Sequence, residues 1–347
     1  MDIIESTLDK YIREIDDHCL GSRIRAAAET LEKLDSYIQS IRANNVNGGD
    51  NNTPELSSIE SIIDRLYTTN KRINRLRQES KEIDMLLNVL HEDFKSVGWT
   101  EINKVDGIHT MYKENGSGMH SIRIDGIVSS PIFNICSVLL EVDLYNTWIP
   151  RLTECNLLAS DDRFRKVIYC RAECPWPIAD RDLCLYGYGV DMLEDKEQTF
   201  VVVSRTYEDG DFDHNVVIPP PTGKPSSVVR SHTQISGFTI KPLSPTETYV
   251  QVVSCTDPRM KFVPYWFLNF ITNQFSHYLF QMLRQQAQKV TTSPEFQKRI
   301  ASNPIYSVIK EKSELYFKNK ELEKEKENEK EQKITATENH LKDYMHG

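Results

Sequence analysis

The chain has 347 residues and a formal net charge of −9, which argues against a general nucleic-acid binder because contact with phosphates needs a surplus of clustered Lys and Arg. Acidic residues near the N-terminus stand where a secretory signal needs basic ones. Seven cysteines spread along the chain fit reduced thiols better than a disulfide framework, so the sequence predicts a cytoplasmic protein.

The first part of the chain, residues 1–95, is predicted to be helical because its apolar residues fall at helical spacing. They repeat as heptads in two runs, which the Asn- and Gly-rich stretch NNVNGGDNNTPE separates. The pattern predicts either an antiparallel helical hairpin or a coiled coil that self-associates or binds a protein partner through residues 55–95. The spacing alone favours neither. The apolar heptad positions are Ile24, Ala27, Leu31, Leu34, Ile38 and Ile41 in the first run, and Ile59, Ile62, Leu66, Ile73, Leu76, Ile83, Leu87 and Leu90 in the second.

Two segments bear on contact with membranes. The basic stretch 71–81, KRINRLRQESK, is either a solvated helix face, which its charge favours, or a surface for anionic lipid head groups. The most apolar window, residues 262–283, is interrupted by amide side chains and a histidine that are costly in hydrocarbon. We therefore expect peripheral membrane contact and no membrane span.

The middle of the chain, residues 100–290, has the period-two alternation of β-strands. TMYKENGSGMHSIRIDGIV predicts a hairpin that turns at Asn115-Gly116, and five further strand-like runs follow. A short helix is expected from Pro131, and a long helix with an apolar face ends near Lys289. Residues 291–347 form a charged, partly helical or disordered tail, because Lys and Glu dominate its later part and cannot bury a core.

Known catalytic and metal motifs are absent. The chain has no GxSxG, HExxH, P-loop or GxGxxG, and Cys170 and Cys174 have no partner pair at zinc spacing. The sequence predicts no catalytic residues, no metal and no cofactor. A curved antiparallel sheet around a long helix can instead leave an apolar cavity, and such a cavity suits a lipid.

The late helix carries an apolar face wider than an ordinary amphipathic stripe. The plainer interpretation is a packed core helix, and the alternative is that some of the same positions line a cavity. The residues of this face are Val263, Trp266, Phe267, Phe270, Ile271, Phe275, Leu279, Met282 and Leu283.

Several segments resemble a known family. WIPRL, VIYCRAECPWPIADRD, VVRSH, SGFTIKPL and CTDPRMKFVPYWFLN occur in unbroken order across roughly residues 100 to 290 and look like a START domain, the steroidogenic-acute-regulatory-related lipid transfer family. The resemblance implies an α+β helix-grip fold, in which a curved antiparallel sheet grips the C-terminal helix around a tunnel for one lipid. It also implies that CPWPIADRD connects two strands.

The resemblance also suggests residues for the tunnel. We expect the late helix to contact lipid tails, with two further residues near the polar end of the tunnel. Arg181 is interpreted first as a structural residue held by the carboxylates of Asp180 and Asp182, and second as a polar group at the tunnel mouth. Trp176 is expected to pack against the domain. The candidate tunnel residues are Leu268, Ile271, Phe275 and Leu279 on the late helix, and Trp148 and Arg181 near the polar end.

Departures from the family pattern concern the lipid head group. Tyr145 and Ile149 flank Trp148 where phosphatidylcholine-binding members have an Arg and an acidic residue, and residues 187–189 lack an Arg found in several members. The resemblance therefore does not favour phosphocholine. The long, Pro-rich loop 207–227 is either a lid over the tunnel or an ordinary surface connection.

The function implied by the resemblance is binding of one lipid, a phospholipid, sterol or sphingolipid, and its transfer between membranes without covalent chemistry. One alternative is a coiled-coil scaffold whose START-like domain senses lipid. Another is an acyl-thioester hydrolase, since some members are fused to thioesterase domains. We expect three regions: the helical residues 1–95, the lipid-binding residues 100–290 and the tail 291–347.

Overall fold

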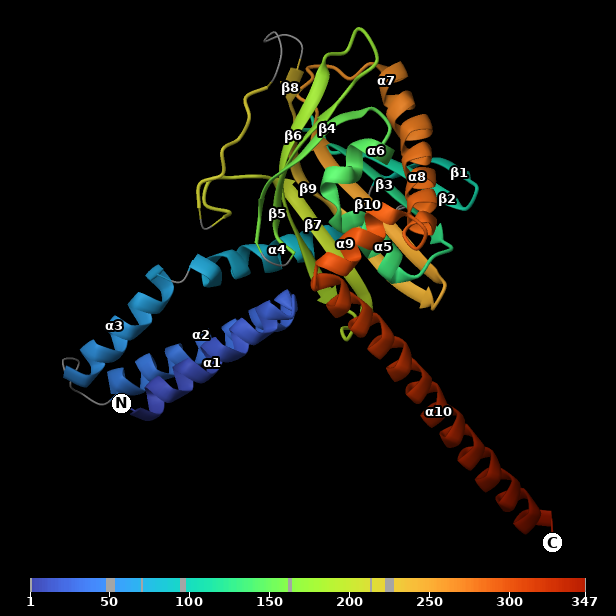
Figure 1. Cartoon of the computed structure of the whole chain (residues 1–347). Helices are drawn as coiled ribbons and strands as arrows, with labels where there is room; N and C mark the ends of the chain where they lie inside the picture. Colours follow the sequence, from blue (N-terminus) through green and yellow to red (C-terminus); the bar gives the residue numbers. More distant parts are fainter. Residues whose placement is uncertain are drawn as a thin grey trace.

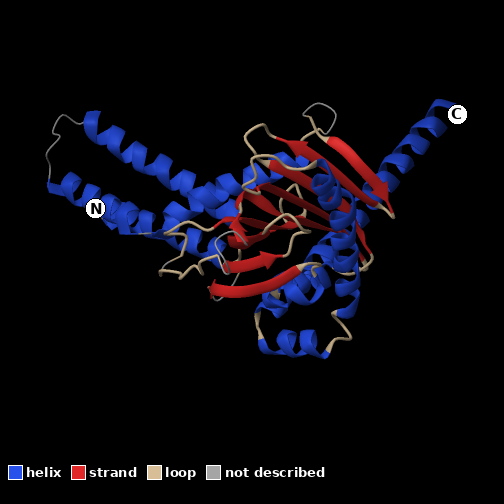
Figure 2. Ribbon diagram, turned by 90° about the horizontal axis from the view of Figure 1, so that it is seen from above, coloured by secondary structure: helices blue, strands red, loops and turns tan. Residues whose placement is uncertain are grey.

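The computed structural model describes residues 2–47, 54–69, 71–93, 98–161, 164–212, 214–221 and 228–346. Within them the chain forms three parts: N-terminal helices, a ten-stranded sheet with helices against one face, and a long C-terminal helix (Figure 1). Seen from above, the strands make one curved layer, and the N-terminal and C-terminal helices leave it on opposite sides (Figure 2).

The N-terminal helices include a hairpin, formed by α1 (Asp2–Leu20) and α2 (Ile24–Asn47). Helices α3 (Pro54–Thr69) and α4 (Lys71–His91) follow. Every apolar heptad position of the first run is buried, because these side chains fall on one face of α2, which packs against α1 and α4. A helical hairpin is confirmed, although its partner for α2 is α1, which was in neither heptad run; α2 also packs against α4, which carries the second run.

The sheet is antiparallel except at one short strand. Its order is β1-β2-β3-β10-β9-β7-β6-β5-β4, and β8 pairs in parallel with β6. The hairpin predicted at Asn115-Gly116 joins β2 and β3, and Gly116 has a φ of 76° there. The strands are β1 (Thr100–Val105), β2 (Ile108–Glu114), β3 (His120–Val128), β4 (Leu152–Ser160), β5 (Lys166–Ala172), β6 (Asp180–Met192), β7 (Thr199–Thr206), β8 (Val228–Arg230), β9 (His232–Ser244) and β10 (Glu247–Asp257).

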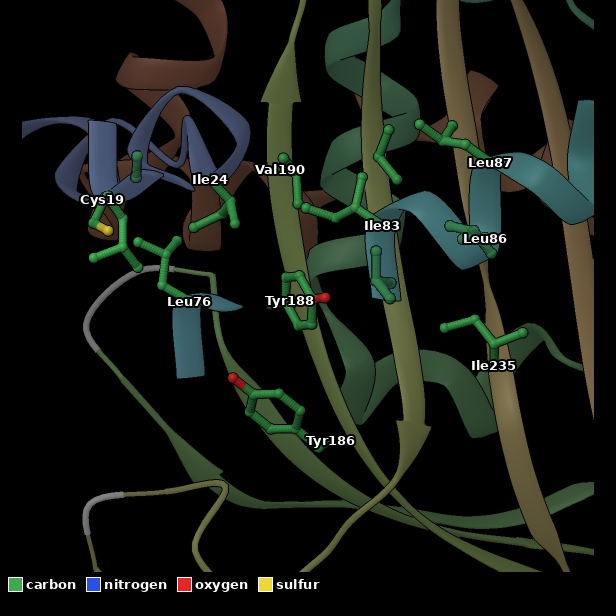
Figure 3. Packing of buried hydrophobic residues seen from close by; sticks show 14 of the residues in the cluster. Cys19, Ile24, Leu76, Ile83, Leu86, Leu87, Tyr186, Tyr188, Val190 and Ile235 are labelled. Carbon is green, nitrogen blue, oxygen red and sulfur yellow. The ribbon is translucent and has the colours of Figure 1, made fainter. Parts of the chain in front are cut away.

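Helix α4 covers one face of the sheet, which we call the α4 face. The side chains of Ile83 and Leu86 are buried there in one cluster with Tyr186 and Tyr188 of β6 (Figure 3). The apolar heptad positions of α4 are therefore covered within the chain by its own sheet and helices. The side chains of Ile59 and Leu66, in the same heptad run, lie outside the described residues.

Close approach between α4 and the sheet depends on a glycine in β9. A Cβ atom on Gly237 would lie 2.9 Å from Leu86 Cδ2 and 2.0 Å from the carbonyl oxygen of Val202. Since non-bonded carbon atoms prefer separations of about 3.5–4.0 Å, only glycine fits at this position.

Two buried carboxylates of α4 bind arginines beneath the helix. Glu79 accepts two hydrogen bonds of 2.8 Å from Arg165, and Glu82 pairs with Arg205. The hydroxyl of Tyr186 donates to Glu79 at 2.7 Å, and burial raises the pKa of this tyrosine. Charges buried this deeply are tolerated because each one has a partner.

The opposite face of the sheet, the inner face, is covered by different helices. They are α5 (Ile132–Leu140), the short segments η1 (Val142–Leu144) and α6 (Tyr145–Trp148), and the late helix. Because successive strand residues point to opposite faces, each strand supplies both faces with separate side chains. The late helix lies on this inner face, and the predicted α+β helix-grip fold is confirmed.

The late helix differs from the continuous α-helix that was predicted. It consists of α7 (Tyr265–Asn269), a π-helical segment η2 (Phe270–Phe275) and α8 (Ser276–Lys289). The hydroxyl of Ser276 donates to the carbonyl oxygen of Ile271 at 2.7 Å, which satisfies a backbone acceptor in the widened turn. Spacing of apolar residues alone does not reveal such a turn.

Helices α9 (Pro294–Ser302) and α10 (Ile305–His346) complete the chain. The buried side chains of Phe296, Tyr306 and Ile309 join the inner-face cluster, so the start of the predicted tail packs against the sheet domain. Beyond it, α10 projects away from the domain (Figure 1). No helix among the described residues has the length and apolarity needed to cross a membrane.

Candidate functional site

A cavity of about 220 Å³ lies on the inner face of the sheet. Strands β5, β6, β7 and β9 form one wall, and α5 forms part of the opposite wall. Two more distant segments, the turn between α1 and α2 and the first part of α10, also line the cavity. Its apolar lining includes Leu139, Leu140, Val142, Phe164, Ile168, Leu185, Phe200, Val202, Phe238, Ile240 and Ile309.

Two glycines form part of the cavity wall in β6. Gly187 and Gly189 line the cavity at the positions where the resemblance pointed to a missing arginine. A Cβ atom on Gly189 would lie 3.2 Å from the ring of Phe164, so a larger residue would displace that ring. This stretch of β6 thus presents no side-chain charge to the cavity.

None of the six candidate tunnel residues is part of the cavity lining. Trp148 and Leu279 are nearest in packing, since they belong to the inner-face cluster that also contains the lining residues Phe200 and Phe238. The indole Nε1 of Trp148 is buried without a hydrogen-bond partner among the described residues. An uncompensated buried donor costs free energy, so Trp148 could bind an acceptor supplied by a ligand.

The other late-helix candidates lie nearer the start of that helix. Leu268 is in α7, and Ile271 and Phe275 are in the π-helical segment; all three are half-buried. The ring of Phe275 lies 6.4 Å from that of Phe270, over which the guanidinium of Arg151 sits at 5.5 Å. Their contact with a lipid remains a prediction.

Arg181 is not held by its neighbouring carboxylates, contrary to expectation. Asp180 and Asp182 each bind an arginine of an adjacent strand, because alternate residues of β6 point to opposite faces. Arg181 instead donates to the carbonyl oxygens of Pro258, at 2.7 Å, and Ala179. Partial burial without an ion pair lowers the pKa of this guanidinium. These contacts support its first interpretation, a structural residue.

Trp176 was expected to pack against the domain, and this is wrong, because its side chain is 90% exposed. It lies in the connection between β5 and β6, which Arg181 ties through Pro258 to the segment before α7. Two further exposed aromatic residues lie nearby in sequence: Phe262 (77%) in that segment and Tyr265 (82%) at the start of α7. We call Trp176, Phe262 and Tyr265 the aromatic end of the molecule.

The loop 207–227 was one candidate for a lid. Residues 213 and 222–227 lie outside the described residues, and the described part of the loop does not line the cavity. Asp211 ties the start of the loop to Arg205 at 2.6 Å. A lid function remains a prediction.

Comparison with known proteins identifies the middle of the chain. The START domain model matches residues 89–292. The chain belongs to the START domain family. Among solved structures, human STARD10 is 16% identical with a TM-score of 0.50, covering 64% of this chain and 84% of its own. Human StAR-related lipid transfer protein 5 is 16% identical with a TM-score of 0.50, covering 62% and 97%. Identities this low establish a shared fold alone. No curated protein sequence matches the chain.

Residues outside the START domain complete its cavity. Gly21 and Ser22 precede the matched segment, and Ile309 and Lys312 follow it, yet all four line the cavity. Sequence reasoning missed them because they lie in segments that read as a coil and a charged tail. It also missed Lys166, although the alternation of β5 places this lysine on the same face as the cavity residue Ile168.

Proposed function

We propose that this START domain protein binds one lipid in the inner-face cavity and carries it between membranes. The observation that supports the proposal is the largely apolar cavity between β6, β7, β9 and α5. Each methylene removed from water contributes about 0.8 kcal/mol, which makes an apolar cavity a favourable place for an acyl chain in transit. The activity needs no covalent step, so we propose a carrier and not an enzyme.

Contact with the membrane is assigned in this proposal to the aromatic end. Exposed Trp176, Phe262 and Tyr265 are costly in water, whereas aromatic side chains are favoured at the interface between membrane and water. Phe262 and Tyr265 lie at the start of the late helix. We propose a path for the lipid from this end along Leu268, Ile271, Phe275 and Leu279 toward the cavity, with Trp148 and Arg181 near its polar groups.

The proposed setting is the cytoplasm, with peripheral binding at membranes. All seven cysteines are free thiols, which fits a reducing compartment. A scaffold that binds partners through residues 55–95 is less favoured, because the apolar heptad positions described on α4 are already buried within the chain.

Binding is tested first by native mass spectrometry of the full chain purified from cells, followed by extraction of any bound molecule. A lipid released in one-to-one amount supports the proposal. Transfer is tested with the full chain and fluorescent lipid in donor and acceptor vesicles. No bound lipid together with no transfer above a protein-free control would contradict the proposal. Release of free acid from an added acyl thioester would revive the hydrolase alternative.

The aromatic end gives the transfer assay a specific variant. We expect Trp176→Ala combined with Phe262→Ala to slow transfer about tenfold or more, because burial of each aromatic side chain is worth about 1.5–3 kcal/mol. Equilibrium lipid binding in detergent should change little. Leu315→Ala, at an exposed leucine of α10, is the matched control and should transfer at the normal rate. Equal slowing by both variants would remove the aromatic end from the mechanism.

A further inference from the structure

The cavity wall carries three charged side chains: Lys166, Asp191 and Lys312. Two of them neutralise each other, because the ammonium group of Lys312 pairs with the carboxylate of Asp191. Lys312 also donates to the carbonyl oxygen of Gly21 at 3.3 Å, and Asp191 accepts from the backbone amide of Leu193 at 3.1 Å. This pair therefore adds no net charge to the cavity.

Lys166 is different, since its ammonium group has no hydrogen-bond or ion-pair partner among the described residues. The acidic groups near it are already engaged. Arg299 binds Glu141 at 2.6 Å and Asp143 at 2.8 Å, and Asp161 pairs with the arginine just before β5. Burial lowers the pKa of Lys166, and the carboxylates of Glu141, Asp143 and Asp161 offset this only in part. The cavity wall consequently holds one ammonium group that has no direct ion-pair partner among the described residues.

The size of the cavity limits how large a ligand can bind beside Lys166. A protein cavity of about 150 Å³ is large enough for benzene. At about 220 Å³ the cavity is only moderately larger, so it suits one chain and is too small for a phospholipid with two long tails. The wall near Lys166 is apolar, with Leu140, Phe164, Ile168 and Leu185 among its members.

We propose that the cavity selects a single-chain amphiphile with one anionic group, a carboxylate or a phosphate, which the ammonium group of Lys166 binds while the chain lies against the apolar wall. This inference rests on the proposed lipid-binding function and names the class of its ligand. A charge-assisted hydrogen bond in a partly dry site is stronger than a neutral one. The preference for an anion should thus exceed the effect of adding one methylene to the chain.

The test is calorimetric titration of the full chain with three ligands of equal chain length: decanoate, decyl phosphate and decanol. Lys166→Met keeps the apolar stem and removes the charge, so we expect affinity for at least one of the two anions to fall about ten- to a hundred-fold while affinity for decanol stays the same or rises. Whichever anion binds more tightly to the wild-type chain identifies the preferred head group. The matched control is Lys196→Met, at a lysine that is 85% exposed, and it should change nothing.

The outcomes separate the two proposals. If decanol binds but Lys166→Met leaves the affinity for both anions unchanged, the assignment to Lys166 is wrong while lipid binding stands. If none of the three ligands binds and no lipid is extracted from the purified protein, the proposed function itself fails. A measurement on the wild-type chain does not depend on how the variant folds: decanoate should bind more tightly than decyltrimethylammonium, and the reverse order would overturn the inference.

Discussion

The two faces of the sheet have opposite characters, although the same strands build both. On the α4 face, β6 contributes Tyr186, Tyr188 and Val190, which pack closely with helix side chains. On the inner face the same strand contributes Leu185 and two glycines to a hollow wall. A strand can therefore supply a rigid support with one set of alternate residues and a binding site with the other.

The two faces also differ in whether their charged side chains form ion pairs. Glu79 and Glu82 on the α4 face are buried, and each has an arginine partner, whereas Lys166 on the inner face has no partner among the described residues. Breaking a buried ion pair destabilises the fold, whereas a half-buried charge without an ion-pair partner can still bind a ligand. Stability should consequently depend on the α4 face, and ligand affinity on the inner face.

The largest effect is expected from Arg165→Ala on the α4 face. The change leaves the carboxylate of Glu79 buried without its cation, so the free energy of unfolding should fall by about 3–5 kcal/mol in chemical denaturation. Arg42→Ala is the control, because its pair with Glu60 is half exposed and should contribute less than about 1 kcal/mol. If both variants lose the same unfolding free energy, the buried pair is no more important for stability than the exposed one.

A smaller difference is expected between two leucine truncations. Leu86→Ala opens a cavity in the packed α4 face and should cost about 2–5 kcal/mol of unfolding free energy. Leu185→Ala removes a side chain that already borders empty space, so its cost should be clearly lower. Leu185→Ala should instead admit longer ligand chains in the titrations. If Leu185→Ala destabilises the protein more than Leu86→Ala, the inner face is packed at least as densely as the α4 face.

The smallest effect concerns pH. Burial raises the pKa of Cys136, beside the cavity, to about 12, and that of Cys184, on the α4 face, to about 11, from an ordinary 9.0. Above about pH 9 the unfolded thiols lose their protons while the folded ones keep them, so stability falls as pH rises. Cys136→Ala should flatten the fall more than Cys184→Ala in urea denaturation from about pH 8 to about pH 11. A steeper fall in either alanine variant would reverse the sign.

Most of the fold could be predicted from the sequence, because the spacing of apolar residues and one family motif indicate most of its helices, strands and connections. Heptads marked α2 and α4, alternation placed the strands, and PWPIADRD marked the connection between β5 and β6. The π-helical turn was missed because it depends on local hydrogen bonding around Ser276 and leaves the apolar pattern unchanged. The exposure of Trp176 was missed because the motif predicts a connection between two strands. It does not predict whether the side chains of that connection contact the rest of the domain.

The candidate site was predicted less completely. Sequence reasoning located apolar residues on the late helix, but the cavity wall comes mainly from inner-face strand residues such as Phe200 and Phe238, which look like any core residue in an alternating strand. The contributions of Gly21 and Lys312 depend on contacts between segments almost 300 residues apart, with a hydrogen bond of 3.3 Å between them. No local pattern encodes a contact of that kind.

Helix α10 has one further physical consequence. With 42 residues at about 1.5 Å each, it is a rod about 60 Å long whose base, at Ile309 and Lys312, forms part of the cavity wall. A tilt of about five degrees at that base displaces the far tip by about 5 Å. A rod of this length would therefore amplify any small tilt of its base into a much larger displacement of its far end.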